Sequence, residues 1–82
     1  MARLISLRWR TRFGRFVRTR SVTRMSSDLR VTRSTVHGWL SGRHTPRIQF
    51  ARQIVSLSDG RLELGDVYQH TTILRGQVIH AD

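Results

Sequence analysis

The sequence predicts an all-α fold: a compact bundle of about four or five short helices, with room for a short β-strand in the terminal segments. Three observations predict it. Apolar residues recur at helical spacing, small hydroxyl residues stand where helices should begin, and glycines stand where they should end. The 82 residues suffice for one small domain with a modest core. We divide the chain into an N-terminal arm or short strand (1–8), a helical domain (9–69) and a C-terminal tail (70–82).

The first helix is expected to begin at Trp9. Its apolar residues recur at i, i+4, i+7 and i+8, which is one face of a helix, while arginines fill the other face. These apolar residues are Trp9, Phe13, Phe16 and Val17. We interpret the stripe as core. Gly14 should weaken this helix by about 1 kcal/mol relative to alanine.

The next two helices are expected to meet at a tight joint. Ser21 is a candidate N-cap for a helix that ends near Arg30, and Val31 then acts as an apolar plug. The inner face of this helix carries Val22, Met25, Ser26 and Leu29, with Ser26 small enough for a close crossing. Thr32 should cap the third helix, which covers 33–41 and ends at Gly42, the left-handed residue. Its buried face is Val36, Trp39 and Leu40.

Thr45 and Pro46 predict the start of a fourth helix, with a hydroxyl cap followed by proline in the first helical position. This helix should cover 47–58 and bury Phe50, Ala51, Ile54 and Leu57. A turn at Asp59-Gly60, an extended link from Leu62 to Leu64 and one helical turn at 65–68 should follow. The tail has strand-like composition and no clean helical period, so a disordered tail and a strand that pairs across a dimer both stay open.

Charge points to a polyanionic partner. The net charge is +10, yet residues 1–58 carry +12 and residues 59–82 carry −2. Such a concentration attracts phosphate backbones, and the chain lacks the long apolar runs of a helix that lies on a membrane. No run approaches the roughly 20 apolar residues that span a bilayer, and the N-terminal run is too short for a signal peptide. We expect a cytoplasmic protein associated with the nucleoid, with no membrane partner.

Residues for catalysis or metal binding do not cluster in the sequence. The chain has no cysteine, and its histidines (37, 44, 70 and 80) lack metal-ligand spacing, so we expect them to be solvated. The five acids are scattered, and no nucleophile or phosphate-loop motif is present. The sequence therefore predicts no enzyme activity, no metal, no cofactor and no small-molecule substrate.

The joint between the second and third helices carries a more specific pattern. It reads Leu29-x-Val31-Thr32-Arg33-Ser34-Thr35-Val36-x-x-Trp39-Leu40-x-Gly42-Arg43-x-x-Pro46. This pattern resembles the Cro/repressor (XRE-like) helix-turn-helix family of phages and bacteria, and later residues resemble its small Cro-like subgroup. The resemblance covers about residues 12–69. The chain departs from the family at Val22, Ser26 and Arg30, where glutamine, alanine and glycine are usual.

The resemblance implies a sequence-specific DNA-binding transcriptional regulator, a repressor in the simplest case. It would bind double-stranded DNA at a pseudo-palindromic operator as a homodimer and insert helix 33–41 into the major groove. The implied base-reading residues are Arg33, Ser34, His37 and Gly38. Arg33 suits bidentate contact with guanine, whereas Gly38 is equally well interpreted as a tolerated surface glycine. The implied phosphate contacts are Thr23, Arg24, Thr32, Thr35, Arg43, His44 and Thr45.

Two alternatives remain open. A DNA-bending recombination accessory protein, of the excisionase kind, would share the DNA partner. An antitoxin or anti-activator would instead use the same helices to bind a protein, although the basic residues Arg33, Arg43 and Arg47 argue mildly against that alternative. The acidic C-terminal portion and the Trp9–Val17 helix are the candidate dimer surfaces.

Overall fold

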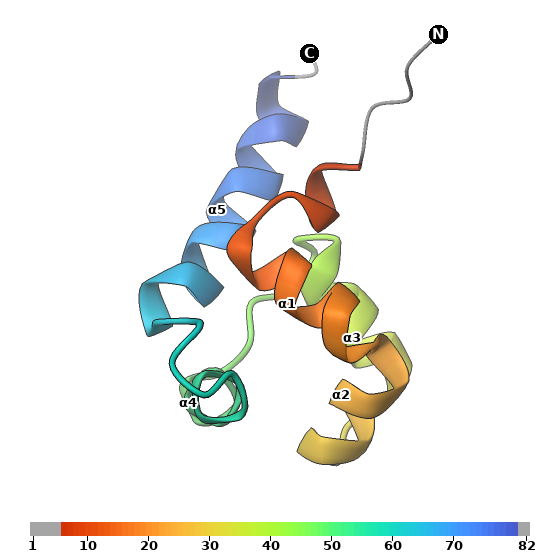
Figure 1. Cartoon of the computed structure of the whole chain (residues 1–82). Helices are drawn as coiled ribbons and strands as arrows, with labels where there is room; N and C mark the ends of the chain where they lie inside the picture. The colour runs from red at the N-terminus through yellow and green to blue at the C-terminus, as the bar shows by residue number, and fades with distance from the viewer. Residues whose placement is uncertain (1–5, 81–82) are drawn as a thin grey trace, which may run out of the picture.

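A computed structural model describes the backbone of residues 6–80 and the side chains of residues 6–76, and over that range the chain is all-α, as predicted, with no strand. Figure 1 shows how the helices surround one core. In chain order the elements are the 3₁₀ helix η1 (Leu7–Trp9) and the α-helices α1 (Arg12–Arg20), α2 (Val22–Leu29), α3 (Arg33–Leu40), α4 (Ile48–Leu57) and α5 (Leu64–His80). Residues 1–5 of the expected N-terminal arm and residues 81–82 of the tail lie outside the described range.

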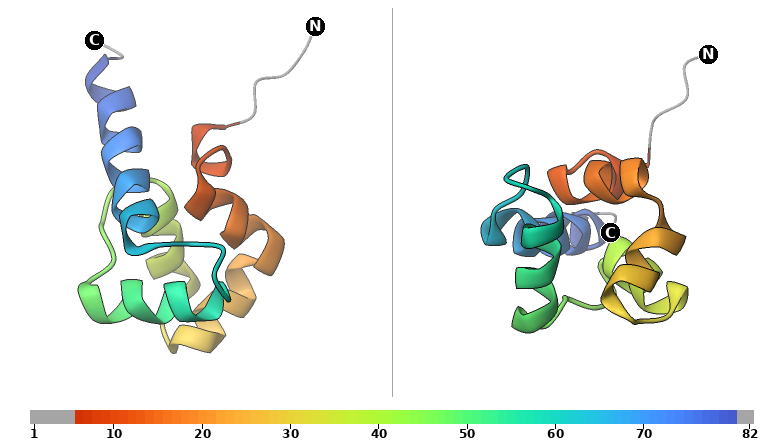
Figure 2. Two further views of the ribbon diagram at one scale, coloured as in Figure 1. Left: turned by 60° about the vertical axis from the view of Figure 1, so that its left-hand side comes forward. Right: turned by 60° about the horizontal axis from the view of Figure 1, so that its bottom comes forward.

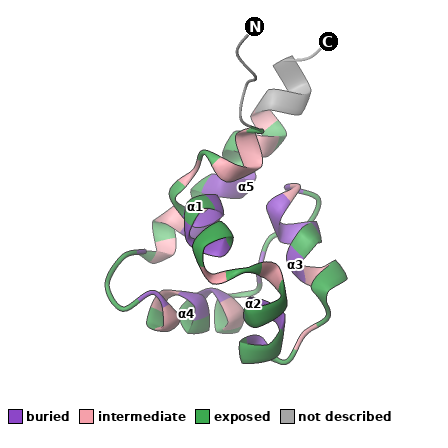
Figure 3. Cartoon of the chain, turned by 45° about the vertical axis from the view of Figure 1, so that its right-hand side comes forward, coloured by how far each residue is buried: buried purple, intermediate pink, exposed green. Residues whose placement is uncertain are grey.

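The helices pack so that α2 contacts α3, and α5 contacts α1, α3 and α4. In Figure 2, α4 lies across one end of the molecule and α5 leads away from it. The buried apolar side chains come from all five α-helices and from the link before α5, as Figure 3 shows by the purple inner faces of the helices. They are Phe13, Phe16, Val17, Met25, Leu29, Val36, Trp39, Leu40, Ala51, Ile54, Leu62 and Val67. The predicted inner faces of α1, α2 and α3 are largely confirmed.

The start of the first helix was predicted wrongly. Leu7–Trp9 form a 3₁₀ turn, and α1 begins only at Arg12, with Thr11 as its cap. The Thr11 hydroxyl accepts a hydrogen bond from the Gly14 amide at 2.9 Å. A Cβ atom at Gly14 would lie 1.7 Å from the carbonyl oxygen of Arg8, so the glycine lets η1 fold back against α1. Because three of the predicted apolar residues of this helix are buried in the core, that face is unavailable for dimerisation.

The joint between α2 and α3 agrees with the prediction. Ser21 caps α2 by accepting from the amide of Arg24, and Thr32 caps α3 by accepting from the amide of Thr35. Ser26 is buried, consistent with a close approach of the two helices. Arg30 ends α2 in the left-handed conformation, with φ 57° and ψ 44°. This is the position where the resembled family usually has glycine.

Replacing Arg30 with glycine is expected to raise the free energy of unfolding by about 0.5–1 kcal/mol, because a left-handed backbone strains any residue that carries a Cβ atom. Urea unfolding followed by circular dichroism measures the change. The matched control is Arg24→Gly, an exposed arginine inside the same helix, which should lose about 1 kcal/mol because glycine is a poor helix former. A loss at both positions would contradict the assigned conformation of Arg30.

The fourth helix begins later than predicted. Arg47 is its N-cap residue, and no side chain makes the capping hydrogen bond, so Thr45 and Pro46 are not the cap and first residue of α4. Pro46 is buried, which indicates that the loop uses this ring as an inward anchor before the helix begins at Ile48. Ala51 and Ile54 are buried as predicted, whereas Phe50 and Leu57 are only half-buried.

The C-terminal part was predicted wrongly, since neither a strand nor disorder describes it. The single turn expected at 65–68 is instead the start of α5, which continues to His80. The Asp66 carboxylate accepts from the amide of Glu63 at 2.9 Å and so satisfies a free donor at the helix start. The inner face uses the i, i+3, i+4 and i+7 positions Val67, His70, Thr71 and Leu74. Two of these residues are polar, which hides the helical period from an analysis of apolar spacing.

Candidate nucleic-acid interface

The outer face of α3 is the centre of the candidate interface. Val36, Trp39 and Leu40 are all buried in the core, so helical geometry leaves the residues between them facing outward. Arg33, Ser34 and His37 are exposed, as predicted, with Arg33 and Ser34 at the start of the helix and His37 just past its middle. Arg33 and His37 are one helical turn apart and therefore lie side by side.

One hollow beside this face is formed by the start of α2 and by η1. It is lined by Trp9, Val22 and Thr23 on one side and by Arg33, Ser34 and His37 on the other. The structure thus brings the predicted phosphate contact Thr23 next to three of the predicted base-reading residues. Trp9 was predicted as core, but it is half-buried and lines this hollow. The sequence held no signal for this position, because it depends on the η1 turn that folds back against α1.

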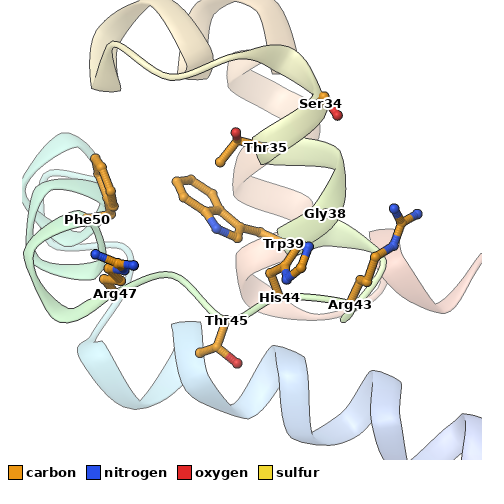
Figure 4. Close-up of a pocket in the computed structure, with 9 residues that line it drawn as sticks. All are labelled: Ser34, Thr35, Gly38, Trp39, Arg43, His44, Thr45, Arg47 and Phe50. Atoms are coloured by element: carbon orange, nitrogen blue, oxygen red, sulfur yellow. The ribbon is translucent and has the colours of Figure 1, made fainter.

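A second hollow, of about 380 Å³, lies on the other side of α3 and is drawn in Figure 4. It contains residues from α3, from the loop 41–47 and from α4, which are Ser34, Thr35, Gly38, Trp39, Arg43, His44, Thr45, Arg47 and Phe50. The predicted phosphate contacts of the loop therefore share one hollow with Ser34. Arg47 and Phe50 were not among the predicted site residues. Phe50 reaches the site by packing on Trp39, with ring centroids 5.7 Å apart.

Gly38 differs from the other predicted base-reading residues because it is buried beneath the ring of His44. A Cβ atom added at Gly38 would lie 2.9 Å from Cδ2 of that imidazole. The amide of His44 also donates to the carbonyl oxygen of Gly38 at 3.2 Å. The absence of a side chain at Gly38 therefore lets the His44 ring pack against α3. Gly38 does not lie on the outer face with Arg33 and His37.

The predicted phosphate contacts near the starts of α2 and α3 differ in how freely their side chains are exposed. Thr32 and Thr35 bond to each other at the start of α3, with 2.9 Å between their hydroxyl oxygens. Thr32 is exposed and Thr35 is half-buried, so these hydroxyls serve the helix cap and keep only part of their surface free. Thr23 and Arg24 are both exposed in the first turn of α2.

The electrostatic character of this face is uniformly basic. Arg33 lines the first hollow, Arg43 and Arg47 line the second, and no acidic residue lines either one. Asp28 is the one acid among residues 1–58, and its carboxylate is bound by the guanidinium of Arg20 at 2.8 Å. The acid closest in sequence to the site is thus already neutralised by a cation outside it.

His70 contradicts the expectation that the histidines are solvated. It is 1% exposed and, from within α5, joins the start of α1 to the end of α3. Its Nε2 lies 2.9 Å from the carbonyl oxygen of Leu40, and its Nδ1 lies 2.6 Å from the hydroxyl of Thr11. Since a carbonyl only accepts, Nε2 donates; in the neutral ring, which burial favours, Nδ1 then accepts from the Thr11 hydroxyl. Burial lowers the pKa of His70 below its ordinary value of 6.5.

Other kinds of site are not found in the part of the chain that the structure describes. Among residues 6–76, whose side chains the structure describes, no three histidine, aspartate or glutamate side chains are grouped to hold a metal ion. Over the same range no helix combines the length and the apolar character needed to cross a bilayer. Comparisons of the chain with protein-family models, with curated proteins and with solved structures find no match.

Proposed function

We propose that the chain is a sequence-specific DNA-binding transcriptional regulator that inserts α3 into the major groove. The observation that carries this proposal is the outer face of α3, where Arg33, Ser34 and His37 are exposed together between two basic hollows. A major groove about 12 Å wide admits one α-helix, and arginine matches the O6 and N7 acceptors of guanine. Blocking a promoter is the simplest mechanism for a regulator that acts through DNA binding alone.

The two hollows support different roles for the residues of this face: those in α3 would contact bases, and those beside it would contact phosphates. With α3 in the groove, the loop residues Arg43, His44 and Thr45 on one side and Thr23 on the other would meet the phosphates of the two groove walls. Such contacts fix the register of a protein on DNA and supply much of the affinity, whereas contacts with base edges select the sequence. The excess positive charge of residues 1–58 favours the same partner.

We further propose that the regulator acts as a homodimer. Three exposed side chains on one helix can read only a few base pairs, which is too little to select one operator in a genome. Two half-sites one helical turn apart are separated by about 34 Å. The molecule extends 24–35 Å along its principal axes, so two copies are of a size to occupy neighbouring half-sites.

Selection from a pool of random duplexes tests the proposal directly. The expected result is an enriched motif with two-fold symmetry, which the chain prefers over a scrambled duplex at every salt concentration that allows binding. Equal affinity for selected and scrambled duplexes across salt concentrations would refute sequence-specific regulation. Strong bending of the selected duplex without an effect on transcription would favour the accessory-protein alternative. Co-purification with a protein partner and no DNA shift would favour the antitoxin or anti-activator alternative.

Replacing Arg33 with alanine is expected to cost about 1–3 kcal/mol of discrimination at one base pair of the selected motif, because a bidentate base contact is lost. Fluorescence anisotropy with a set of single-base-pair variants of the motif measures it. Arg24→Ala serves as the phosphate-contact control and should weaken binding to all duplexes by a similar factor. If Arg33→Ala also weakens all duplexes equally, Arg33 contacts phosphate and not a base.

A further inference from the structure

Arg75 on α5 makes a long-range contact with the loop that follows α3. Its Nε donates to the carbonyl oxygen of Gly42 at 3.0 Å, and its Nη2 donates to the carbonyl oxygen of Arg43 at 3.3 Å. The partners are more than 30 residues apart in the sequence. The planar guanidinium can donate to two carbonyls at once, so one side chain fixes two consecutive residues of the loop.

The neighbouring residue of α5 strengthens this attachment. A Cβ atom added at Gly42 would lie 2.6 Å from Cβ of Leu74, so the loop backbone packs directly on the helix. Gly42 also has a φ of +79°, which glycine adopts without strain. The close approach and the left-handed conformation together explain why a glycine stands at this place.

The loop therefore has two separate supports. The amides of Gly42 and His44 donate to carbonyls of α3, namely those of Trp39 and Gly38. The carbonyls of Gly42 and Arg43 receive their hydrogen bonds from Arg75 instead. Loss of Arg75 would keep the hydrogen bonds of the loop to α3 and the packing of Gly42 on Leu74, but would leave the carbonyls of Gly42 and Arg43 without their hydrogen bonds to α5.

We infer that Arg75 is a positioning residue for DNA binding: it holds the loop so that Arg43 and His44 meet the phosphate backbone. This inference rests on the proposed function. The guanidinium of Arg75 is committed to two carbonyls of the loop, so its effect on DNA passes through Arg43 and His44 and not through a phosphate contact of its own. A helix outside the helix-turn-helix thereby becomes part of the DNA-binding machinery.

The first test measures the affinity of Arg75→Gln and Arg75→Lys for the selected duplex. We expect Arg75→Gln to bind about tenfold more weakly, since two hydrogen bonds to the loop are lost, and Arg75→Lys to recover part of that loss by donating to one carbonyl. The control is Gln69→Ala, an exposed residue on the same helix, which should bind like the native chain. Native affinity in Arg75→Gln would overturn the inference.

The second test separates positioning from direct contact. The slope of log affinity against log salt should be the same in the double variant Arg75→Gln/Arg43→Gln as in Arg43→Gln alone, whereas a phosphate contact made by Arg75 itself would lower it by about 1 more. In a double-mutant cycle, Arg75→Gln combined with Arg43→Gln should lose less than the product of the two separate factors, because the second change removes a contact that is already misplaced. Combined with Arg24→Gln, which lies on α2, the factors should multiply. A slope lower in the double variant than in Arg43→Gln, or independence from Arg43, would overturn the inference.

A measurement without DNA distinguishes this inference from the proposed function. In the free protein, Arg75→Gln should shift the amide resonances of Arg43 and His44 while those of α2 stay in place. If the native chain selects no duplex, the proposed function fails, and with it the role of Arg75 in DNA binding, although the shifts would still report the attachment of the loop. If the duplex is bound and these resonances do not move, the positioning role alone is refuted.

Discussion

Replacing Gly14 with alanine is expected to lower the free energy of unfolding by about 3 kcal/mol, although alanine is the better helix former. The added Cβ atom would lie 1.7 Å from the carbonyl oxygen of Arg8. Because that oxygen belongs to the backbone, relief requires η1 to move away from α1, which disturbs the packing of Trp9. Urea unfolding followed by tryptophan fluorescence measures the loss.

The control for this change is Gly76→Ala, inside α5. Among the described residues, and apart from the backbone of its own helix and its chain neighbours, no atom lies within 4 Å of a Cβ atom built at Gly76, so alanine should raise the free energy of unfolding by about 0.5–1 kcal/mol. The two substitutions are chemically identical and are expected to have opposite signs. Stabilisation by both would mean that η1 does not pack on Gly14.

Replacing His70 with alanine is expected to lower the free energy of unfolding by about 3–4 kcal/mol at pH 7. The change leaves a cavity against Phe13, whose ring centroid lies 5.0 Å from that of His70. It also removes a hydrogen-bond partner from the carbonyl of Leu40 and from the hydroxyl of Thr11. The start of α1 and the end of α3 both lose their contact with α5, so thermal and urea unfolding should both detect the loss. A change smaller than about 1 kcal/mol would contradict the buried position.

The same residue gives the stability of the native chain a dependence on pH. Burial lowers the pKa of His70 in the folded chain below the value of 6.5 that applies when the chain is unfolded. The unfolded state therefore binds more protons as the pH falls through 6.5, so this contribution to stability is complete above that pH and is lost below it. Urea unfolding at pH 7.5 and pH 5.5 should show the loss in the native chain and a smaller one in His70→Ala.

The sequence predicted best the features that local rules determine. The caps at Ser21 and Thr32 and the left-handed Gly42 were correct because each depends on residues within a few positions. The outer face of α3 followed from helical period alone, which placed Arg33, Ser34 and His37 outside the core.

The features that the sequence did not reveal depend on contacts between distant segments. The late start of α1 follows from the approach of Arg8 to Gly14 across a 3₁₀ turn, and spacing along one helix carries no sign of it. The length of α5 was missed because His70 and Thr71 occupy inner positions that apolar residues usually fill. The role of Arg75 could not be predicted because its contact with the loop joins residues more than 30 positions apart in the sequence.

The packing of the His44 ring over Gly38 determines which positions of α3 can be varied to change the DNA sequence that the protein binds. Under the proposed function, the exposed positions 33, 34 and 37 can be randomised together, since their side chains leave the core and the loop untouched. Position 38 is best kept as glycine in such a library, because a Cβ atom there would force the imidazole of His44 to shift from its place against α3. Repressors with altered operators should therefore emerge from three variable positions, and libraries that include the fourth should return glycine at that place.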